Sequence, residues 1–207
     1  MKRIAVLVSG GGTNLQALID AQGRGELGNG KITAVISTKA DAYALQRAKN
    51  AGIEGFVLPR KEYDSNQAIT VALVELLKKL EIDLVVLAGC MTIFTAELVS
   101  AYPNAIMNVH PALIPAFCGT GYYGLRVHEE ALRYGVKLSG ATVHFVSEEC
   151  DGGPIIAQKS VEVRPGDTPE TLQKRIMEQA EWVLLPQAVR AFCEDRIAVD
   201  GRTVIIR

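Results

Sequence analysis

The chain has 207 residues, of which 48% are hydrophobic and 22% are charged, and its formal net charge is −1. This balance is typical of a globular protein that buries a full core, and the length predicts one domain over residues 1–207. Nucleic-acid-binding proteins normally present a basic surface, so the charge argues against nucleic acid as a partner. No apolar run approaches the roughly 20 residues that cross a bilayer, so no membrane partner is expected.

The cysteines indicate a reducing environment. Cys90, Cys118, Cys150 and Cys193 are widely spaced and form no CxxC pair. This spacing favours free thiols in a cytoplasmic protein over a disulfide framework or a zinc site. Because no group of His, Cys, Asp and Glu residues shows metal-ligand spacing, no metal is expected.

The first half of the chain alternates short apolar runs with longer segments of helical periodicity. Strands are predicted at residues 3–9, 32–37, 55–58, 84–88 and 105–109, and helices at residues 13–21, 42–51, 66–80 and 95–101. This alternation predicts an α/β, Rossmann-like fold with a mostly parallel central sheet and helices on both faces. Ligands of such sheets bind beyond the carboxyl ends of the strands, which places residues 9–12, 89–94 and 108–110 at one edge.

The second half of the chain has a different pattern. Residues 111–126 form a long loop with several glycines, and a short helix is predicted at residues 127–134. Residues 139–146 and 155–163 alternate like antiparallel strands. We therefore expect an antiparallel extension of the sheet toward the C-terminus.

The last part of the chain carries clear helix and turn signals. A long helix is predicted to begin after the N-cap Thr168, with Pro169 as its first residue, and to end near Glu194. Pro186 lies inside this helix and is expected to kink it. Asp200-Gly201 then predicts a terminal β-hairpin.

The segment Gly10-Gly11-Gly12-Thr13-Asn14 lies where the first strand turns into the first helix. Glycines let the backbone approach an anion, and the free N–H groups at the helix start point toward it. Leu15 replaces the third glycine of a dinucleotide fingerprint, and no Gly-Lys-Ser/Thr follows for a P-loop. The segment favours a single phosphomonoester over NAD or ATP, and a plain turn capped by Thr13 is the alternative.

An amide, an imidazole and a carboxylate stand in two short runs, Asn108-Val109-His110-Pro111 and Asp151-Gly152-Gly153-Pro154. Together such groups polarise a carbonyl and move a proton at neutral pH. The alternative is structural, because a histidine after a strand is often a satisfied polar residue and an Asp-Gly-Gly-Pro run is often just a turn. The choice depends on whether the fold brings the two runs together.

The segment from Gly89 to Phe94 follows the most apolar strand, and its surface suits a flat heterocycle. Ordinary core packing of Met91, Ile93 and Phe94 is the alternative. Among the remaining candidates, Arg60-Lys61 is interpreted as a solvated pair, with an anion contact as the alternative.

The other two histidines are weaker candidates for a functional role. His128 falls in the short helix after the long loop, either on the surface or lining that loop. His144 lies in the middle of a strand, where a satisfied structural histidine is the favoured interpretation.

Five segments, in order along nearly the whole chain, resemble the phosphoribosylglycinamide formyltransferase family, folate-dependent enzymes of purine biosynthesis. These segments are residues 9–15, 87–91, 108–115, 142–146 and 151–154. The resemblance implies transfer of a formyl group from 10-formyltetrahydrofolate, as co-substrate, to the amine of glycinamide ribonucleotide. The products would be formylglycinamide ribonucleotide and tetrahydrofolate.

The resemblance also implies a role for each matching residue. The catalytic residues would be Asn108, His110 and Asp151. The acceptor substrate would be bound by Gly11, Gly12, Thr13 and Asn14 at its phosphate, and by Glu181 at its ribose or glycinamide portion. The folate pocket would be lined by Met91, Thr92, Ile93, Phe94 and Asn108, together with the loop before Asp151.

The chemistry expected of these residues is direct attack of the acceptor amine on the formyl carbon. Negative charge then develops on the formyl oxygen, to which Asn108 and a protonated His110 donate hydrogen bonds. A free histidine has a pKa of about 6.5, so Asp151 is expected to keep His110 charged at neutral pH. Asp151 would also take the surplus proton of the amine through a water.

Three features depart from the family pattern. Residues 117–125 are longer than the short loop of many members, Thr92 replaces an arginine that often follows the methionine, and Glu178 replaces a basic residue of some members. These departures affect the details of folate and phosphate contacts and leave the catalytic residues in place.

The nearest alternative is another enzyme that uses 10-formyltetrahydrofolate, either a hydrolase or one with a different acceptor. A transfer-RNA formyltransferase is expected to carry a further C-terminal domain, and a hydrolase a further N-terminal domain. A non-catalytic folate or nucleotide sensor is the alternative from a different class, since a fold does not fix a function. The sequence leaves a monomer and a homodimer equally open.

Overall fold

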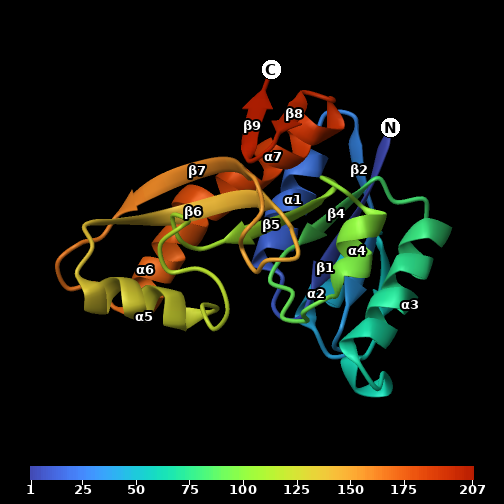
Figure 1. Ribbon diagram of the computed structural model, residues 1–207, viewed down its shortest axis with the longest axis horizontal. Coiled ribbons are helices and arrows are strands. Elements are labelled where there is room, and N and C mark those ends of the chain that lie inside the picture. Colours follow the sequence, from blue (N-terminus) through green and yellow to red (C-terminus); the bar gives the residue numbers. More distant parts are fainter.

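One nine-stranded sheet runs through the molecule, and the computed structural model describes residues 1–207 around it (Figure 1). The strands are β1 (Lys2–Val8), β2 (Gly30–Ser37), β3 (Glu54–Val57), β4 (Leu84–Leu87), β5 (Ile106–His110), β6 (Leu138–Phe145), β7 (Ile155–Glu162), β8 (Ile197–Asp200) and β9 (Thr203–Ile206). Their order across the sheet is β3-β2-β1-β4-β5-β6-β7-β9-β8. From β3 to β5 all neighbours are parallel, whereas β5, β6 and β7 pair antiparallel. The mostly parallel sheet with an antiparallel extension is therefore confirmed.

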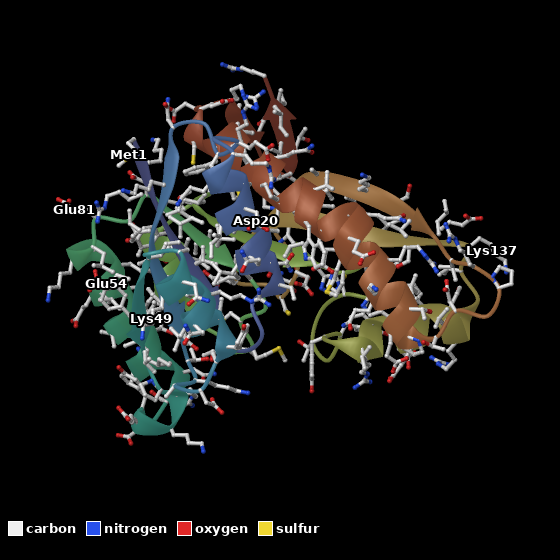
Figure 2. The ribbon with its side chains drawn as sticks, turned by 180° about the vertical axis from the view of Figure 1, so that it is seen from behind. Met1, Asp20, Lys49, Glu54, Glu81 and Lys137 are labelled. Atoms are coloured by element: carbon white, nitrogen blue, oxygen red, sulfur yellow. The ribbon has the colours of Figure 1, made fainter.

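Helices cover both faces of this sheet. They are α1 (Thr13–Gly23), α2 (Tyr43–Asn50), the short 3-10 helix η1 (Arg60–Glu62), α3 (Asn66–Lys79), α4 (Ala96–Ala101), α5 (Leu125–Tyr134), α6 (Pro169–Ile176), the π-helical turn η2 (Met177–Glu181) and α7 (Trp182–Cys193). Figure 2, seen from behind, shows α1 and the continuous helix of α6 and α7 in front of the sheet. None of these helices combines the length and the apolar character of a membrane span.

The alternation of side chains along the strands creates two cores. In β1, Ile4 and Val6 belong to the larger core under α1, α2, α6 and α7, whereas Ala5 and Leu7 belong to the smaller core under α3 and α4. A strand buried on both faces reads as a continuous apolar run, which is the pattern of residues 4–8. The two cores fix the sheet between two layers of helices.

The order of strands reverses at β1, because the chain moves outward from β1 to β2 and β3 and then returns to β4 on the other side. Ligands of open α/β sheets bind at such a switch point, beyond the carboxyl ends of the strands. In register, Leu7 of β1 lies beside Leu87 of β4, which lies beside Asn108 of β5. The segments after β1, β4 and β5 therefore meet at one edge.

Two predictions near the C-terminus are shifted in detail. The long helix begins as predicted, because the Thr168 side chain accepts a hydrogen bond from the Thr171 N–H. Its irregular part is the π-helical turn η2, and the helix continues through Pro186. Pro186 has no N–H for the carbonyl of Trp182, four residues earlier, and η2 ends directly before Trp182. The terminal hairpin is present, with β8 extending to Asp200.

His128 is a buried residue of α5, and the interpretation as a surface residue is wrong. The side chain is 0% exposed, and neither ring nitrogen has a hydrogen-bond partner. Burial, with a smaller contribution from the neighbouring His110, lowers the pKa of His128 to about 4. The neutral imidazole therefore packs as an apolar ring in the folded chain.

Acidification is expected to destabilise the fold through His128. The unfolded chain takes up a proton near pH 6.5 and the folded chain only near pH 4, so stability falls as the pH drops through this window. The loss approaches about 3 kcal/mol at the acid end. Denaturant unfolding of His128→Leu between pH 7 and pH 4 is expected to show a smaller loss than the unaltered chain. Equal losses would show that another group carries the pH dependence.

Candidate active site

Asn108, His110 and Asp151 meet at the carboxyl edge of the sheet. Asn108 and His110 lie on β5, two residues apart and thus on one face of the strand. Asp151 reaches them from the connection between β6 and β7. Its Oδ2 lies 3.5 Å from His110 Nδ1, and its Oδ1 lies 3.4 Å from Asn108 Nδ2. These three residues, which the resemblance implies to be catalytic, are adjacent in the structure.

The Asp151 turn is shaped so that the carboxylate faces the strand. Asp151 has a φ of 54°, in the left-handed region. A Cβ on Gly153 would lie 1.8 Å from the carbonyl oxygen of Phe145, so only glycine fits there. The Phe145 N–H closes the turn by donating to the carbonyl of Pro154 at 2.9 Å. Residues 151–154 therefore form a tight turn, and this turn holds Asp151 in the site.

His144 is a fourth member of the cluster, and it is a buried histidine with hydrogen bonds at both ring nitrogens, as the favoured interpretation expects. The antiparallel register places it directly opposite Asn108. Its Nδ1 donates to the carbonyl of Phe145 at 2.8 Å, so Nε2 is free to accept from Asn108 Nδ2 at 3.2 Å. Nε2 also lies 3.5 Å from Asp151 Oδ1. The signal in the sequence was the two-residue spacing of Thr142 and His144, which matches that of Asn108 and His110.

The long loop after β5 closes over these residues with its main chain. The Nε2–H of His110 donates to the carbonyl of Phe117 at 2.8 Å, and the N–H of Gly119 donates to Asp151 Oδ2 at 2.9 Å. Because Nε2 carries the proton in this contact, Nδ1 is the nitrogen of His110 that faces Asp151. A second proton on the imidazole would therefore enter between Nδ1 and the carboxylate.

Electrostatics keep the carboxylate ionised and the imidazole neutral in the ligand-free chain. Burial alone would raise the pKa of Asp151, but His144, His110 and the N–H of Gly119 hold it below its ordinary value. Burial lowers the pKa of His110 more than Asp151 and the Phe117 carbonyl raise it. Asp151 does favour the imidazolium as expected, yet burial outweighs it while His110 is only 4% exposed.

The convergent side chains bond to one another and to the main chain. No group of three or more His, Cys, Asp and Glu side chains is arranged to hold a metal ion. One ring nitrogen of His110 and one of His144 are each engaged by a main-chain carbonyl. The side chains around Asn108 are therefore arranged as hydrogen-bond donors and acceptors.

The glycine loop presents uncapped amide groups. Gly12 is the N-cap of α1, with a φ of 72°, and no side chain caps the helix start. Thr13 is the exposed first residue of α1, so the alternative of a turn capped by Thr13 is wrong. A helix start with free N–H groups is suited to a phosphate. This loop follows β1, directly beside the strand that leads to the folate-pocket candidates.

Asn14 and Glu181 form a buried polar pair behind this loop. The Nδ2 of Asn14 donates to Glu181 Oε2 at 2.7 Å, and the Oδ1 of Asn14 is buried without a partner. Burial raises the pKa of Glu181 to about 7, against the bond from Asn14, which lowers it. Glu181 is the last residue of the π-helical turn η2, a distortion that is common at functional sites.

The segment after β4 exposes an apolar surface. Met91 is 54% exposed and Ile93 is 71% exposed, so the alternative of ordinary core packing is wrong for both. Phe94 instead packs against the smaller core. The N–H of Met91 donates to Ser9 Oγ at 3.0 Å, which fixes this segment to the end of β1. Thr92 is half-buried in the same segment.

Comparison with known proteins shows which family the chain matches. Residues 2–189 match the formyl transferase family. The phosphoribosylglycinamide formyltransferase of Haemophilus influenzae is 43% identical over 95% of this chain and 90% of its own length. The crystal structure of glycinamide ribonucleotide transformylase 1 from Symbiobacterium toebii is 45% identical, with a TM-score of 0.93 over 100% of this chain and 94% of that chain.

A hydrolase of the same fold is more distant. A formyltetrahydrofolate deformylase from Pseudomonas syringae is 28% identical, with a TM-score of 0.86, and this chain covers 65% of that chain. The sequence identity, and the share of the partner's own length that is covered, are thus higher for the two transformylases. The chain belongs to the formyl transferase family and, within it, to the phosphoribosylglycinamide formyltransferases.

Proposed function

We propose that Asn108, His110 and Asp151 transfer the formyl group of 10-formyltetrahydrofolate directly to the amine of glycinamide ribonucleotide. The observation that carries this proposal is their convergence between two neighbouring features, an exposed apolar segment after β4 and an uncapped glycine loop after β1. The apolar segment, Met91 to Phe94, suits the flat pterin, and the residues from Gly11 to Asn14 suit the phosphate of the acceptor.

Hydrogen bonds to the formyl oxygen are the main catalytic contribution that we assign. As the amine attacks, negative charge grows on this oxygen, and the amide of Asn108 and the Nε2–H of His110 donate to it. In the ligand-free chain this Nε2–H is engaged by the carbonyl of Phe117. When the formyl group enters, the carbonyl of Phe117 therefore has to release His110, and Asp151 Oδ1 has to release the second N–H of Asn108.

Proton movement is the second contribution. Asp151 is ionised and lies beside His110 Nδ1. Growing negative charge on the formyl oxygen favours the imidazolium, whose second proton would sit against Asp151. The same carboxylate is placed to take the surplus proton of the amine through a water, and N10 of the folate gains a proton as its bond to the formyl carbon breaks. His144 is a positioning residue in this scheme, because its Nε2 accepts from Asn108 and so holds the amide.

A mass-spectrometric assay tests the reaction itself. Purified chain is incubated with 10-formyltetrahydrofolate, with and without glycinamide ribonucleotide. We expect formylated ribonucleotide and tetrahydrofolate together, and only when the acceptor is present. Formate released without acceptor would make the chain a hydrolase, and binding without turnover would make it a sensor.

Removing either partner of the His110–Asp151 pair is expected to reduce turnover far more than stability. For His110→Ala the loss of one oxyanion donor should lower kcat by about 10²–10³-fold, or about 2.7–4 kcal/mol. Asp151→Ala should lose turnover similarly, because the imidazolium and the surplus proton both depend on it. Glu148→Ala, an exposed residue of the same connection, is the matched control. Near-normal kcat in either variant would remove the role assigned to that residue.

Glu181 is expected to bind the acceptor as a carboxylate, although ionisation of this buried group destabilises the folded chain. Its pKa of about 7 predicts that the KM for glycinamide ribonucleotide falls as the pH rises through 7. Glu181→Gln should abolish this pH dependence and raise the KM at pH 8 by about tenfold, with the change in kcat small.

Stability provides an independent measurement on the same variant. Folding raises the pKa of the Glu181 carboxyl group. The free energy of unfolding therefore decreases as the pH rises from 4.5 through about 7. Glu181→Gln should therefore be more stable than the unaltered chain at pH 8 and equally stable at pH 4. Glu75→Gln, at an exposed carboxylate of α3, is the control. A KM that does not respond to Glu181→Gln contradicts the binding role.

A further inference from the structure

Helix α2 holds the glycine loop from the side opposite to its free amides. The N–H of Ala44 donates to the carbonyl of Gly10 at 3.1 Å. A Cβ on Gly12 would lie 2.6 Å from the Cβ of Ala44, so α2 and the loop are in direct contact and Gly12 has no room for a side chain. The first turn of α2 is thus part of the support of the loop.

Arg47, one turn further along α2, engages the next carbonyl of the loop. Its Nε donates to the carbonyl of Gly11 at 2.8 Å, and its Nη1 donates to Gln16 Oε1 on α1 at 2.9 Å. The guanidinium also lies over the ring of Tyr43, 5.0 Å from the ring centroid. Three contacts from three directions fix this cation, which is the only charged side chain that bonds to the main chain of residues 10–14.

The two anchored carbonyls determine where the amides point. In a planar trans peptide the C=O and the following N–H point in opposite directions. With the carbonyls of Gly10 and Gly11 turned toward α2, the N–H groups of Gly11 and Gly12 turn away from it. Successive N–H groups on one side of a loop, next to the start of a helix, form a concavity for an anion.

The charge of Arg47 adds to this orientation. A hydrogen bond from a guanidinium is stronger than one from a neutral donor, and it polarises the peptide group that accepts it. The N–H of Gly12, in the same peptide group as the carbonyl of Gly11, becomes a better donor to a phosphate. No other residue in contact with the loop supplies this effect, because Ala44 donates from its neutral main chain.

We infer that Arg47 is a positioning residue for the phosphate of the acceptor substrate, acting through the Gly11–Gly12 peptide group that it holds and polarises. This inference rests on the proposed function, since the phosphate belongs to the acceptor named there. It assigns to α2 a part in substrate specificity without any contact between Arg47 and the substrate.

Steady-state kinetics of Arg47→Gln and Arg47→Lys test this assignment. Arg47→Gln should raise the KM for glycinamide ribonucleotide by about tenfold or more while kcat and the KM for 10-formyltetrahydrofolate stay near their original values. Arg47→Lys keeps the charge and the packed stem but lacks the planar fork, so its KM should be intermediate. The control is Lys49→Gln, an exposed cation of the same helix that is labelled in Figure 2.

The dephosphorylated acceptor separates positioning from general damage. Glycinamide riboside lacks the phosphate, so its KM should be the same in Arg47→Gln and the unaltered chain. An equal rise for both acceptors would reduce Arg47 to a structural residue and overturn the inference. An unchanged KM for the ribonucleotide in Arg47→Gln would overturn it as well.

A binding measurement decides the inference even if the formyl transfer fails. Inorganic phosphate is titrated into ¹⁵N-labelled chain, and the shifts of the Gly11, Gly12 and Thr13 amides are followed. We expect these amides to respond in the unaltered chain and in Lys49→Gln, and to respond at much higher phosphate concentration in Arg47→Gln. Identical titrations in all three would overturn the inference, whereas absence of formylated product would overturn only the proposed function.

Discussion

The antiparallel pairing of β5 with β6 is the constraint on which the site depends. Up to β5 the sheet is parallel, so each strand contributes only the loop that follows it to the carboxyl edge. The reversal at β6 sets a second polar strand against β5, with His144 opposite Asn108 and Thr142 opposite His110. The connection after β6 starts beside Met107 and Ile106, and its turn brings Asp151 back to Asn108 and His110. A shift of one residue in this pairing would turn His144 to the other face of the sheet.

The two buried carboxyl groups illustrate how position determines acidity. Burial raises the pKa of Asp151 and of Glu181 alike, but Asp151 is surrounded by two imidazoles and a main-chain N–H, whereas Glu181 receives a single amide. The outcome is a low pKa at the first site and a pKa of about 7 at the second. The same functional group is thus held as a permanent anion beside His110 and as a titrating group beside Asn14.

Local sequence patterns predicted most of the fold and the members of the site that lie next to strand ends. The alternation of strands and helices, the edge that collects residues 9–12, 89–94 and 108–110, and the N-cap at Thr168 all follow from nearby residues. The contact of His144 with Asn108 and the burial of His128 could not be predicted locally, because they come from distant parts of the chain, namely the register with β5 and the packing of α5. The π-helical turn at Glu181 has no short sequence signature, and the role of Arg47 depends on a contact 36 residues away from it in sequence.

The contacts of the long loop with His110 and Asp151 use only main-chain atoms, a carbonyl from Phe117 and an N–H from Gly119. Such contacts depend on the path of the backbone and are indifferent to most side chains placed along it. Substitutions that keep this path are therefore expected to keep both contacts. The residues that constrain the path most are those with positive φ, namely Phe117, Gly119, Gly121 and Gly124.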